Sequence, residues 1–390
     1  MKIPKQKTWV EISRHDLTSN IKAFRHHIGE KTAIMAVVKA NAYGHGLRLT
    51  AQVADKAGAA WFGVDNVDEA LELRRNGIRK PILVLGYTLN SRLKDCINNS
   101  ISFVVYNLDT VRALRRLHLK PVGPHPSKNA KAAFVHLKIE TGTTRQGVAG
   151  EELRILAREL KKTPGVVIEG ASTHYANIED TTDSTYAKLQ LKRYQEGLRL
   201  LKSEGIDPPW KHTACSAAAI LYPQTYFNLA RIGIAMYGLW PSKETLAVAK
   251  REKRVISLIP VLTWKTVVAQ IKSVKKGSPV SYGLTEHVTR DSRLAILPVG
   301  YWDGYDRRGL SQTGQVLIRG HSCKIVGRVC MNMCVADVTD VRGIKVEDQV
   351  VLLGRQGREI ITAEDLAAKI GTINYEVVTR INPLIPRFLV

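Results

Sequence analysis

Lys39 has a type and a setting that could support covalent chemistry. It follows the apolar run 36–38 and precedes a loop of small residues that contains Gly44 and Gly46. A lysine partly withdrawn from water has a lowered pKa, and the neutral amine can attack a carbonyl carbon to form an imine. A lysine at the end of a strand is more often a solvated edge residue, so its position alone leaves both interpretations open.

The elements that would position Lys39 are indicated by the pattern of apolar runs. Between residues 30 and 240, short β-branched runs alternate with longer stretches of helical periodicity, such as 67–74 and 151–162, which is typical of βα units around parallel strands. Eight such runs predict a (β/α)8 TIM-type barrel, and an open doubly wound sheet is the second choice. The predicted strands are 33–38, 60–64, 82–86, 101–106, 132–139, 166–171, 211–215 and 228–232.

Beyond residue 245 the pattern changes to short apolar segments separated by glycine, which predicts a C-terminal all-β domain. Thr362 and Gly371 mark 362–370 as its one convincing helix, since these residue types cap helices. We expect an N-terminal strand in residues 1–12 that packs on the β domain, a barrel over 13–244 and the β domain over 245–390. The predicted β-domain strands are 262–274, 294–299, 315–318, 323–329 and 349–353.

Composition excludes several classes of protein. Lys and Arg outnumber Asp and Glu by 58 to 35, but they are spread along helix-like stretches without the aromatic residues that stacked bases need, so we expect no specific nucleic acid. The five cysteines form no CxxC pair, so we expect neither a disulfide framework nor a metal site. No apolar run reaches the roughly 20 residues of a membrane span, and the N-terminus lacks a signal-peptide stretch. We therefore expect a cytoplasmic protein without membrane contact.

The segment 38–46, Val-Lys-Ala-Asn-Ala-Tyr-Gly-His-Gly, resembles the cofactor-lysine segment of alanine racemases, which use pyridoxal phosphate. Further matches follow in the family's order through nearly the whole chain. The resemblance implies a barrel joined to a β domain. The matching segments include 138–142 with Arg145, 173–176, 216–218, 231–238, 280–283, 300–301 with 303–304, 327–331 and 374–376.

The resemblance implies a set of cofactor-binding residues. Lys39 would carry pyridoxal phosphate, and Arg231 would donate a hydrogen bond to the pyridine nitrogen. Because arginine only donates, this nitrogen must present a bare lone pair, which makes the ring a weaker electron sink and limits transamination. His174 matches the residue that bridges Arg231 to the catalytic tyrosine, although a lone histidine is otherwise more often part of a core. The implied phosphate contacts are Tyr43, Ser216, Gly233, Ile234 and Tyr375.

The resemblance also implies substrate-binding and catalytic residues. Arg145 would bind the substrate carboxylate, and Lys138 matches a lysine that the family often carbamylates. Racemisation needs a second base, because a proton removed from one face of a planar carbon must return to the opposite face. Tyr282 matches that base, which comes from the other subunit, so we expect a homodimer with shared active sites. The residues that would narrow the substrate channel are Tyr301, Met331 and Tyr375.

The strand count gives a check that does not depend on the family. Barrel active sites lie at the carboxyl ends of the strands, so residues that follow different strands should cluster at one end. Lys39 follows the first predicted strand, Arg145 the fifth, His174 the sixth and Ser216 the seventh, and Arg231 lies in the eighth.

The implied activity is interconversion of L- and D-alanine, which supplies D-alanine for peptidoglycan. A serine or broad-range racemase is the main alternative. A fold-related pyridoxal-phosphate decarboxylase pairs the pyridine nitrogen with a carboxylate, which Arg231 argues against, and a non-catalytic cofactor-carrying barrel protein lacks the β domain. Three departures concern the network behind Arg145 and the substrate range: Glu140 and Asn332 stand where the family usually has aspartate, and Cys215 where asparagine is common.

Overall fold

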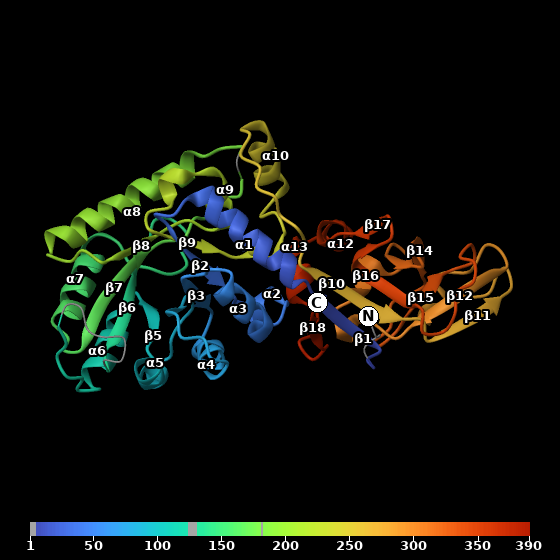
Figure 1. Ribbon diagram of the computed structural model, residues 1–390, viewed down its shortest axis with the longest axis horizontal. Coiled ribbons are helices and arrows are strands. Elements are labelled where there is room, and N and C mark those ends of the chain that lie inside the picture. Colours follow the sequence, from blue (N-terminus) through green and yellow to red (C-terminus); the bar gives the residue numbers. More distant parts are fainter. Residues whose placement is uncertain (1–4, 124–130, 181) are drawn as a thin grey trace. The chain divides into compact units, whose positions relative to one another are not determined.

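The structure, a computed structural model, describes residues 5–123, 131–180 and 182–390 (Figure 1). Its contacts divide the chain into two compact units. The barrel unit comprises Leu17–Ala42 and Leu47–Ile259, and the β unit comprises Met1–Asp16, Tyr43–Gly46 and Pro260–Val390. The first four residues of the predicted N-terminal segment 1–12 lie outside the described residues.

Eight parallel strands form a nearly closed barrel in the barrel unit, which confirms the predicted fold. Each strand from β2 to β7 pairs with the next one along the chain, and β9 pairs with β2. A 3.0 Å hydrogen bond from Arg231 N to Ala214 O links β9 to the residues after β8. The strands are β2 (Ala33–Val37), β3 (Trp61–Val64), β4 (Ile82–Val84), β5 (Ile101–Val105), β6 (Ala133–Lys138), β7 (Val166–Ser172), β8 (Trp210–His212) and β9 (Leu229–Ile232).

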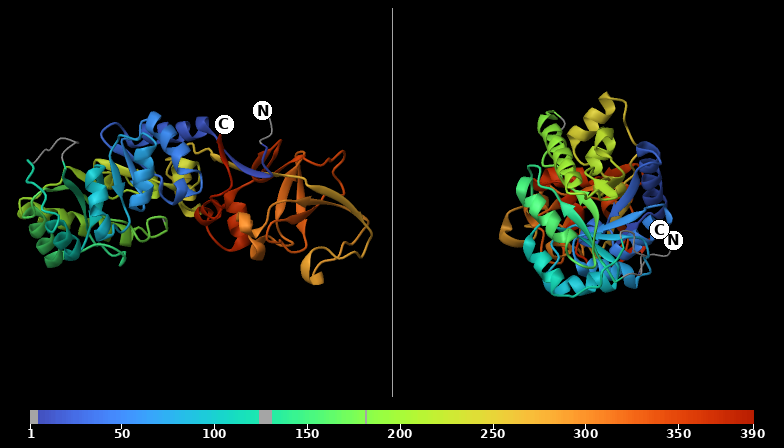
Figure 2. Two further views of the ribbon diagram at one scale, coloured as in Figure 1. Left: turned by 90° about the horizontal axis from the view of Figure 1, so that it is seen from below. Right: turned by 90° about the vertical axis from the view of Figure 1, so that its left-hand side faces the viewer.

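Helices surround the barrel strands, as the two views in Figure 2 show. Their apolar residues form stripes at helical spacing, and in α7 this stripe is 153, 156, 157 and 160, all buried. Burial of such stripes stabilises the barrel by about 25 cal/mol per Å² of apolar surface. The elements are α1 (Arg14–Ile28), α2 (Lys39–Tyr43), α3 (Leu47–Lys56), α4 (Val67–Arg75), η1 (Asn90–Arg92), α5 (Leu93–Asn98), α6 (Leu108–Arg115), α7 (Gly150–Lys161), α8 (Thr185–Ser203), α9 (Ser216–Leu221), η2 (Pro223–Thr225), η3 (Ile234–Tyr237) and α10 (Lys243–Arg251).

The β unit is built on one long, mostly antiparallel sheet, in which β1 pairs with β10 and β18. The predicted strand 262–274 is wrong in one respect, because it forms two strands. Val268 N donates to Asp348 O and Ala269 N donates to Ile296 O, so the chain changes partner between them. The strands are β1 (Thr8–Ile12), β10 (Leu262–Val267), β11 (Gln270–Val274), β12 (Ser292–Leu297), β13 (Gln315–Ile318), β14 (His321–Val326), β15 (Cys334–Asp337), β16 (Gln349–Gln356), β17 (Glu359–Ile361) and β18 (Arg387–Leu389).

The helices of the β unit include the one predicted at 362–370. Helix α12 (Ala363–Ile370) begins with a capping box between Thr362 and Asp365 and ends at Gly371, whose φ is 79°. Two short helices were not predicted, because four to six residues give too weak a periodic signal. They are α11 (Arg307–Leu310) and α13 (Asn374–Thr379), and α13 carries Tyr375; the short turns are η4 (Tyr282–Leu284) and η5 (Tyr301–Asp303).

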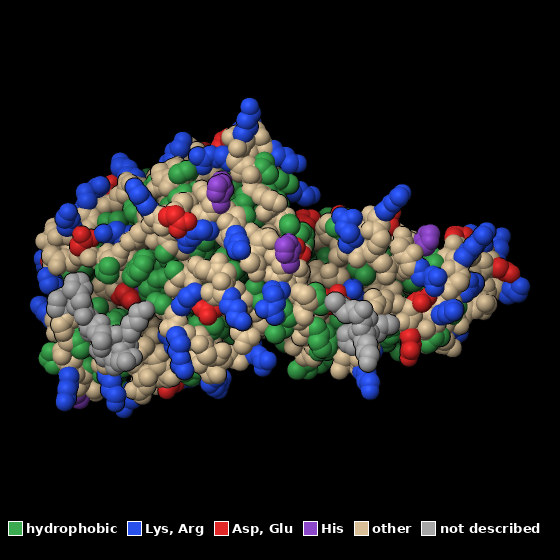
Figure 3. Space-filling model, viewed as in Figure 1, with side chains coloured by type: hydrophobic (Ala, Val, Ile, Leu, Met, Phe, Trp, Pro, Cys, Tyr) green, Lys and Arg blue, Asp and Glu red, His purple; other side chains and the backbone are tan. Residues whose placement is uncertain are grey.

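Positive charge is dispersed over the one face of the molecule that Figure 3 draws. On the face drawn in Figure 3, Lys and Arg side chains are scattered over both units and do not gather in one stripe. A nucleic-acid-binding face normally concentrates its basic residues. Among the described residues, no helix is both long enough and apolar enough to cross a membrane.

Candidate active site

The backbone after Lys39 turns in the left-handed sense. Lys39 lies just beyond β2, at its carboxyl end, and begins α2. Ala40, Asn41 and Ala42 have φ values of 54°, 53° and 55°. For residues other than glycine this conformation costs roughly 1–2 kcal/mol each. Strained backbone of this kind persists where its surroundings impose it, and it is concentrated at functional sites.

Glu69 of α4 imposes the left-handed turn. Its Oε1 accepts hydrogen bonds from Ala40 N at 2.7 Å and Asn41 N at 3.4 Å, and its Oε2 accepts one from Asp65 N at 2.8 Å. Burial raises the pKa of Glu69, and the backbone hydrogen bonds oppose that rise. From the sequence, Glu69 is predicted only to lie in a helix. Its partners are remote in sequence, so no local pattern reveals that it positions the segment carrying Lys39.

Tyr43 extends the turn and belongs to the β unit. Its ring packs against that of Tyr375, with the ring centroids 6.1 Å apart. Gly44 follows with a φ of 82°, and a Cβ at this position would lie 2.0 Å from Val378 O. Glycine is therefore required at the point where this loop contacts α13. The structure brings together two of the expected phosphate contacts.

Arg231 of β9 is buried, and both terminal nitrogens of its guanidinium are engaged. Nη1 donates to His212 Nδ1 at 2.8 Å and to His212 O at 2.9 Å. Nη2 donates to Thr173 O at 2.8 Å and to Thr213 O at 2.9 Å. These contacts fix the plane of the guanidinium. Within the described parts of the chain, Nε of Arg231 has no hydrogen-bond partner.

His174 follows β7, and its Nδ1 lies 3.4 Å from Arg231 Nη2. Burial lowers the pKa of His174 well below its usual value, and the charges of Arg231, Lys138, Arg145 and Lys39 add to this effect. These side chains therefore share one neighbourhood at the barrel end, as the strand positions predict. The imidazole of His174 is neutral at pH 7.

Ser216, Gly233 and Ile234 lie together beyond the ends of β8 and β9. Ser216 Oγ accepts hydrogen bonds from Gly233 N at 3.0 Å and Ala235 N at 3.5 Å. Ile234 begins the short turn η3. Burial raises the pKa of the neighbouring Cys215 thiol to about 11, so this residue is a neutral thiol at pH 7.

Lys138 ends β6 as a buried amine. Burial is the largest cause that lowers its pKa to about 7, followed by the charges of Arg231 and Arg145. The neutral amine of Lys138 is therefore accessible near pH 7. An uncharged lysine amine is a nucleophile, whereas the ammonium form is not.

Glu140 organises the loop that presents Arg145. Its Oε1 accepts hydrogen bonds from Gly142 N at 2.5 Å and Thr143 N at 2.7 Å, and its Oε2 accepts one from Arg145 N at 3.4 Å. Burial opposes ionisation, but these backbone hydrogen bonds leave the pKa of Glu140 lowered. The residue that departs from the family pattern is therefore a charged carboxylate that closes this loop.

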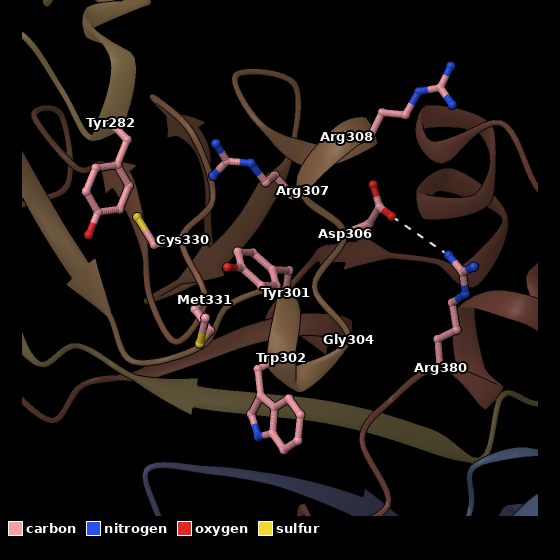
Figure 4. Close-up of a pocket in the computed structure, with 10 residues that line it drawn as sticks. All are labelled: Tyr282, Tyr301, Trp302, Gly304, Asp306, Arg307, Arg308, Cys330, Met331 and Arg380. Atoms are coloured by element: carbon pink, nitrogen blue, oxygen red, sulfur yellow. Dashed lines mark ion pairs between the residues drawn. The ribbon is translucent and has the colours of Figure 1, made fainter.

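Three other predicted site residues surround a cavity of about 880 Å³ in the β unit (Figure 4). Tyr282, Tyr301 and Met331 lie around one open space, with Cys330 beside Tyr282. Two of them are held by neighbouring backbone, because Tyr301 N donates to Cys330 O at 3.0 Å and Trp302 N donates to Met331 O at 3.0 Å. The other lining residues are Trp302, Gly304, Asp306, Arg307, Arg308 and Arg380.

The comparisons with known proteins agree with these two units. Residues 12–241 match the family model of the alanine racemase N-terminal domain, and residues 261–389 match that of the C-terminal domain. The chain belongs to the alanine racemase family. An alanine racemase of Leptospira interrogans serogroup Icterohaemorrhagiae serovar Lai is 37% identical to it over 386 residues, which cover 98% of this chain and 96% of that protein.

Solved structures of racemases are also similar to this chain. The crystal structure of an alanine racemase from Bacillus anthracis with bound L-Ala-P has a TM-score of 0.90 and 35% sequence identity, covering 100% of this chain and 96% of the other. A histidine racemase from Leuconostoc mesenteroides subsp. sake has a TM-score of 0.86 and 28% identity, covering 100% and 99% of the two chains. Members of the alanine racemase family depend on pyridoxal phosphate.

Two further observations concern Tyr375 and His212. Tyr375 packs on Tyr43 and does not line the cavity that Tyr301 and Met331 share. His212 contacts Arg231 directly, yet the sequence analysis does not single it out. A histidine within a predicted barrel strand, where branched apolar residues are usual, is the signal that could have found it.

Proposed function

We propose that this protein interconverts L- and D-alanine, with pyridoxal phosphate carried on Lys39. The observation that carries the proposal is the buried guanidinium of Arg231, fixed at the barrel end that also holds Lys39. When bound, pyridoxal phosphate supplies an electron sink for the charge that remains when a proton leaves the substrate α-carbon. The residues of this chain hold the cofactor, orient the substrate and move the proton.

The described residues fit this cofactor. The two terminal nitrogens of Arg231 are occupied by His212, Thr173 and Thr213, so its Nε–H is the donor available to a ring nitrogen. A guanidinium cannot accept a hydrogen bond, so it holds that nitrogen unprotonated. Less negative charge then spreads into the ring. This favours return of the proton to the α-carbon over transamination.

The phosphate fits the ends of β8 and β9. Ser216 Oγ accepts from Gly233 N, so the hydroxyl proton is available to a phosphate oxygen. The backbone N–H of Ile234, at the start of η3, is a second donor in the same place. Tyr43 and Tyr375 supply phenol groups that we assign to the same phosphate.

Arg145 binds the substrate carboxylate in this proposal. Its guanidinium is exposed on the loop that Glu140 closes, and the planar fork suits a carboxylate. Lys138 has a pKa of about 7, so the neutral amine can add to carbon dioxide and become a negative carbamate. A carbamate is a hydrogen-bond acceptor with negative charge, and it would hold Arg145 in one orientation.

Two bases then act on opposite faces of the α-carbon. Lys39 serves one face, and Tyr282 from a second copy of the chain serves the other. Tyr282 is 68% exposed and Met331 is 55% exposed. Leu284, Trp302 and Met333 of the same unit are also exposed. Large exposed apolar groups in one region favour coverage by another protein surface. We therefore propose a homodimer in which the partner covers this region.

The proposal is tested by locating the cofactor and measuring stereochemistry. Borohydride reduction of the purified protein should fix the mass of reduced pyridoxal phosphate on the peptide containing Lys39. Chiral chromatography should show conversion of L-alanine to D-alanine and the reverse. A label on another lysine, or no D-alanine from a cofactor-loaded protein, would contradict the proposal.

A broader substrate range is the second candidate, favoured by the likeness to a histidine racemase. Tyr301 and Met331 border the cavity in the β unit, and their bulk favours a small side chain such as that of alanine. Relative kcat/KM for L-alanine, L-serine, L-histidine and L-lysine decides between the two. Equal rates on alanine and a larger substrate would support the broad-range enzyme.

A further inference from the structure

A row of polar side chains crosses the barrel interior from Arg231. His212 Nδ1 lies 2.8 Å from Arg231 Nη1, and His212 Nε2 lies 2.8 Å from His136 Nδ1. His136 Nε2 faces Glu169 Oε2 at 3.5 Å. Ser102 Oγ donates to the same carboxylate oxygen at 2.7 Å. Barrel interiors are usually filled by branched apolar residues, so this row is an unusual feature of the fold.

One arrangement of protons is consistent with the hydrogen bonds of the row, and it leaves the Nε2–H of His136 facing Glu169 without a formed hydrogen bond. Arg231 can only donate, so His212 Nδ1 must accept. Burial and the charge of Arg231 lower the pKa of His212 well below its usual value, so its ring is neutral and carries its single proton on Nε2. That proton points to Nδ1 of His136. Nδ1 of His136 accepts that proton, so the ring proton of His136 lies on Nε2, directed at Glu169.

Local backbone geometry builds this arrangement. Val135 pairs with Ile168 and His136 pairs with Gly170, so Glu169 is the extra residue of a β-bulge in β7. Bulges re-aim side chains. A Cβ at Gly170 would lie 2.1 Å from His136 Nδ1, so the glycine leaves room for the imidazole.

Glu169 lies at the opposite mouth of the barrel from Lys39. It lines a cavity of about 1010 Å³ with residues at the starts of β4, β5 and β6, namely Pro81, Ser102 and Phe134. His136 and His212 are fully buried, whereas the Glu169 side chain is 19% exposed. The carboxylate is therefore the end of the row that meets solvent.

We propose that Glu169 is a positioning residue for racemisation, acting through His136 and His212 on Arg231. Its carboxylate is the acceptor group that faces His136 Nε2, at 3.5 Å and without a formed hydrogen bond, and its attraction for the proton on that nitrogen keeps a lone pair of each histidine directed along the row toward Arg231. Without that acceptor, His136 can place its proton on Nδ1, opposite the proton of His212. His212 must then move its proton to Nδ1, where it opposes the N–H of Arg231. This inference rests on the proposed role of Arg231.

The direct test reads the protonation of the histidine rings. Cofactor-loaded protein labelled with ¹⁵N in histidine rings is compared by NMR for wild type, Glu169→Leu and Glu169→Gln, with His136→Asn used to assign signals. We expect bare Nδ1 and protonated Nε2 for both rings in wild type. Leucine keeps the volume without an acceptor, so one or both rings should gain Nδ1 protonation. Glutamine retains an acceptor oxygen and should preserve the wild-type pattern.

The kinetic arm uses the same variants. Glu169→Leu should lower kcat about tenfold and raise the share of pyruvate, with KM for alanine changed less than about twofold. Glu169→Gln should stay within about threefold of wild type. Glu196→Leu, at an exposed position of α8, is the matched control and should leave ring protonation and kcat unchanged. Should Glu169→Leu fail to fold, Glu169→Ala is measured in the same way.

The outcomes separate this inference from the proposed function. Wild-type ring protonation in Glu169→Leu overturns the inference, and so does a fall in kcat without a change in the rings. A wild-type protein that racemises no alanine refutes the proposed function. In that case the ring signals of Glu169→Leu still decide whether Glu169 orders the row.

Discussion

The barrel-end cluster around Arg231 and the cavity of the β unit differ in the burial of their residues and in how those residues are held. Arg231 is 6% exposed and is held by acceptors from its own unit, whereas Tyr282 is 68% exposed on a short turn. A buried polar network must be satisfied within the chain, or it destabilises the fold. The comparison indicates that the barrel end is preorganised within its own unit, and it supports the proposal that another surface completes the cavity of the β unit.

The largest expected effect comes from removing either proposed base. Lys39→Ala and Tyr282→Phe should each lower kcat by more than about a thousandfold, because each removes the proton carrier for one face of the α-carbon. If the bases come from different chains, mixing the two variants under exchange conditions should restore activity. Random exchange of equal amounts should approach about a quarter of the wild-type sites in a two-fold symmetric dimer.

The control for this mixture is confirmation by native mass spectrometry that heterodimers form. Wild-type protein mixed with Lys39→Ala calibrates the rate of exchange. Heterodimers without recovered activity would mean that both bases belong to one chain. The contrast between a self-contained barrel end and a shared cavity would then be wrong.

Changes at Arg231 should have the next largest effect. Arg231→Glu replaces a donor by an acceptor, so kcat should fall about a hundredfold while pyruvate formation rises. Arg231→Lys remains a donor but loses the planar fork. It should lower both kcat and stability without shifting the partition toward pyruvate, as measured by coupled pyruvate assay and thermal unfolding. The same ratio of pyruvate formation to racemisation in both variants would contradict the proposed role of Arg231.

The sequence predicts which residues lie at the barrel end better than it predicts the contacts that position them. The β-branched runs predict all eight barrel strands, and the segment around Lys39 predicts a cofactor lysine. The left-handed turn depends on Glu69, which lies 29 residues from Ala40, and no local pattern encodes that contact. The bulge at Glu169 and the break after Val267 likewise arise from pairing between strands, which a single segment does not specify.

Glu69 offers a smaller test of preorganisation. Glu69→Ala removes the acceptor that holds the left-handed turn, so kcat should fall about tenfold and the free energy of unfolding by about 2 kcal/mol. Glu72→Ala, on the same helix, is the control for loss of helical charge. Both are measured by steady-state kinetics and denaturant unfolding. A wild-type kcat in Glu69→Ala would show that catalysis does not depend on the hydrogen bonds between the turn and Glu69.

The smallest expected effect on catalysis concerns Lys138, which also makes stability depend on pH because its folded pKa of about 7 lies below its ordinary value of 10.5. Above pH 10.5 this residue is neutral in both folded and unfolded chains. As pH falls from 10.5 to 7, the unfolded chain binds the proton and the folded chain does not, so stability decreases. Below pH 7 both states are protonated and this dependence ends. Unfolding free energy relative to Lys138→Met should therefore rise between pH 7 and pH 10 in buffer free of carbon dioxide.

Bicarbonate should lower the KM for alanine of the wild type and leave that of Lys138→Met unchanged. A carbamate on Lys138 replaces a buried amine by an anion between two arginines, which lowers the repulsion there and orients Arg145. Wild type should then show a KM for alanine about threefold lower with bicarbonate than without it, since one charge-assisted contact to the carboxylate is strengthened. Lys138→Met should not respond, and Lys162→Met, an exposed lysine beyond α7, should respond like wild type. An equal bicarbonate response in wild type and Lys138→Met would assign the effect to another group and leave the neutral amine as the working form of Lys138.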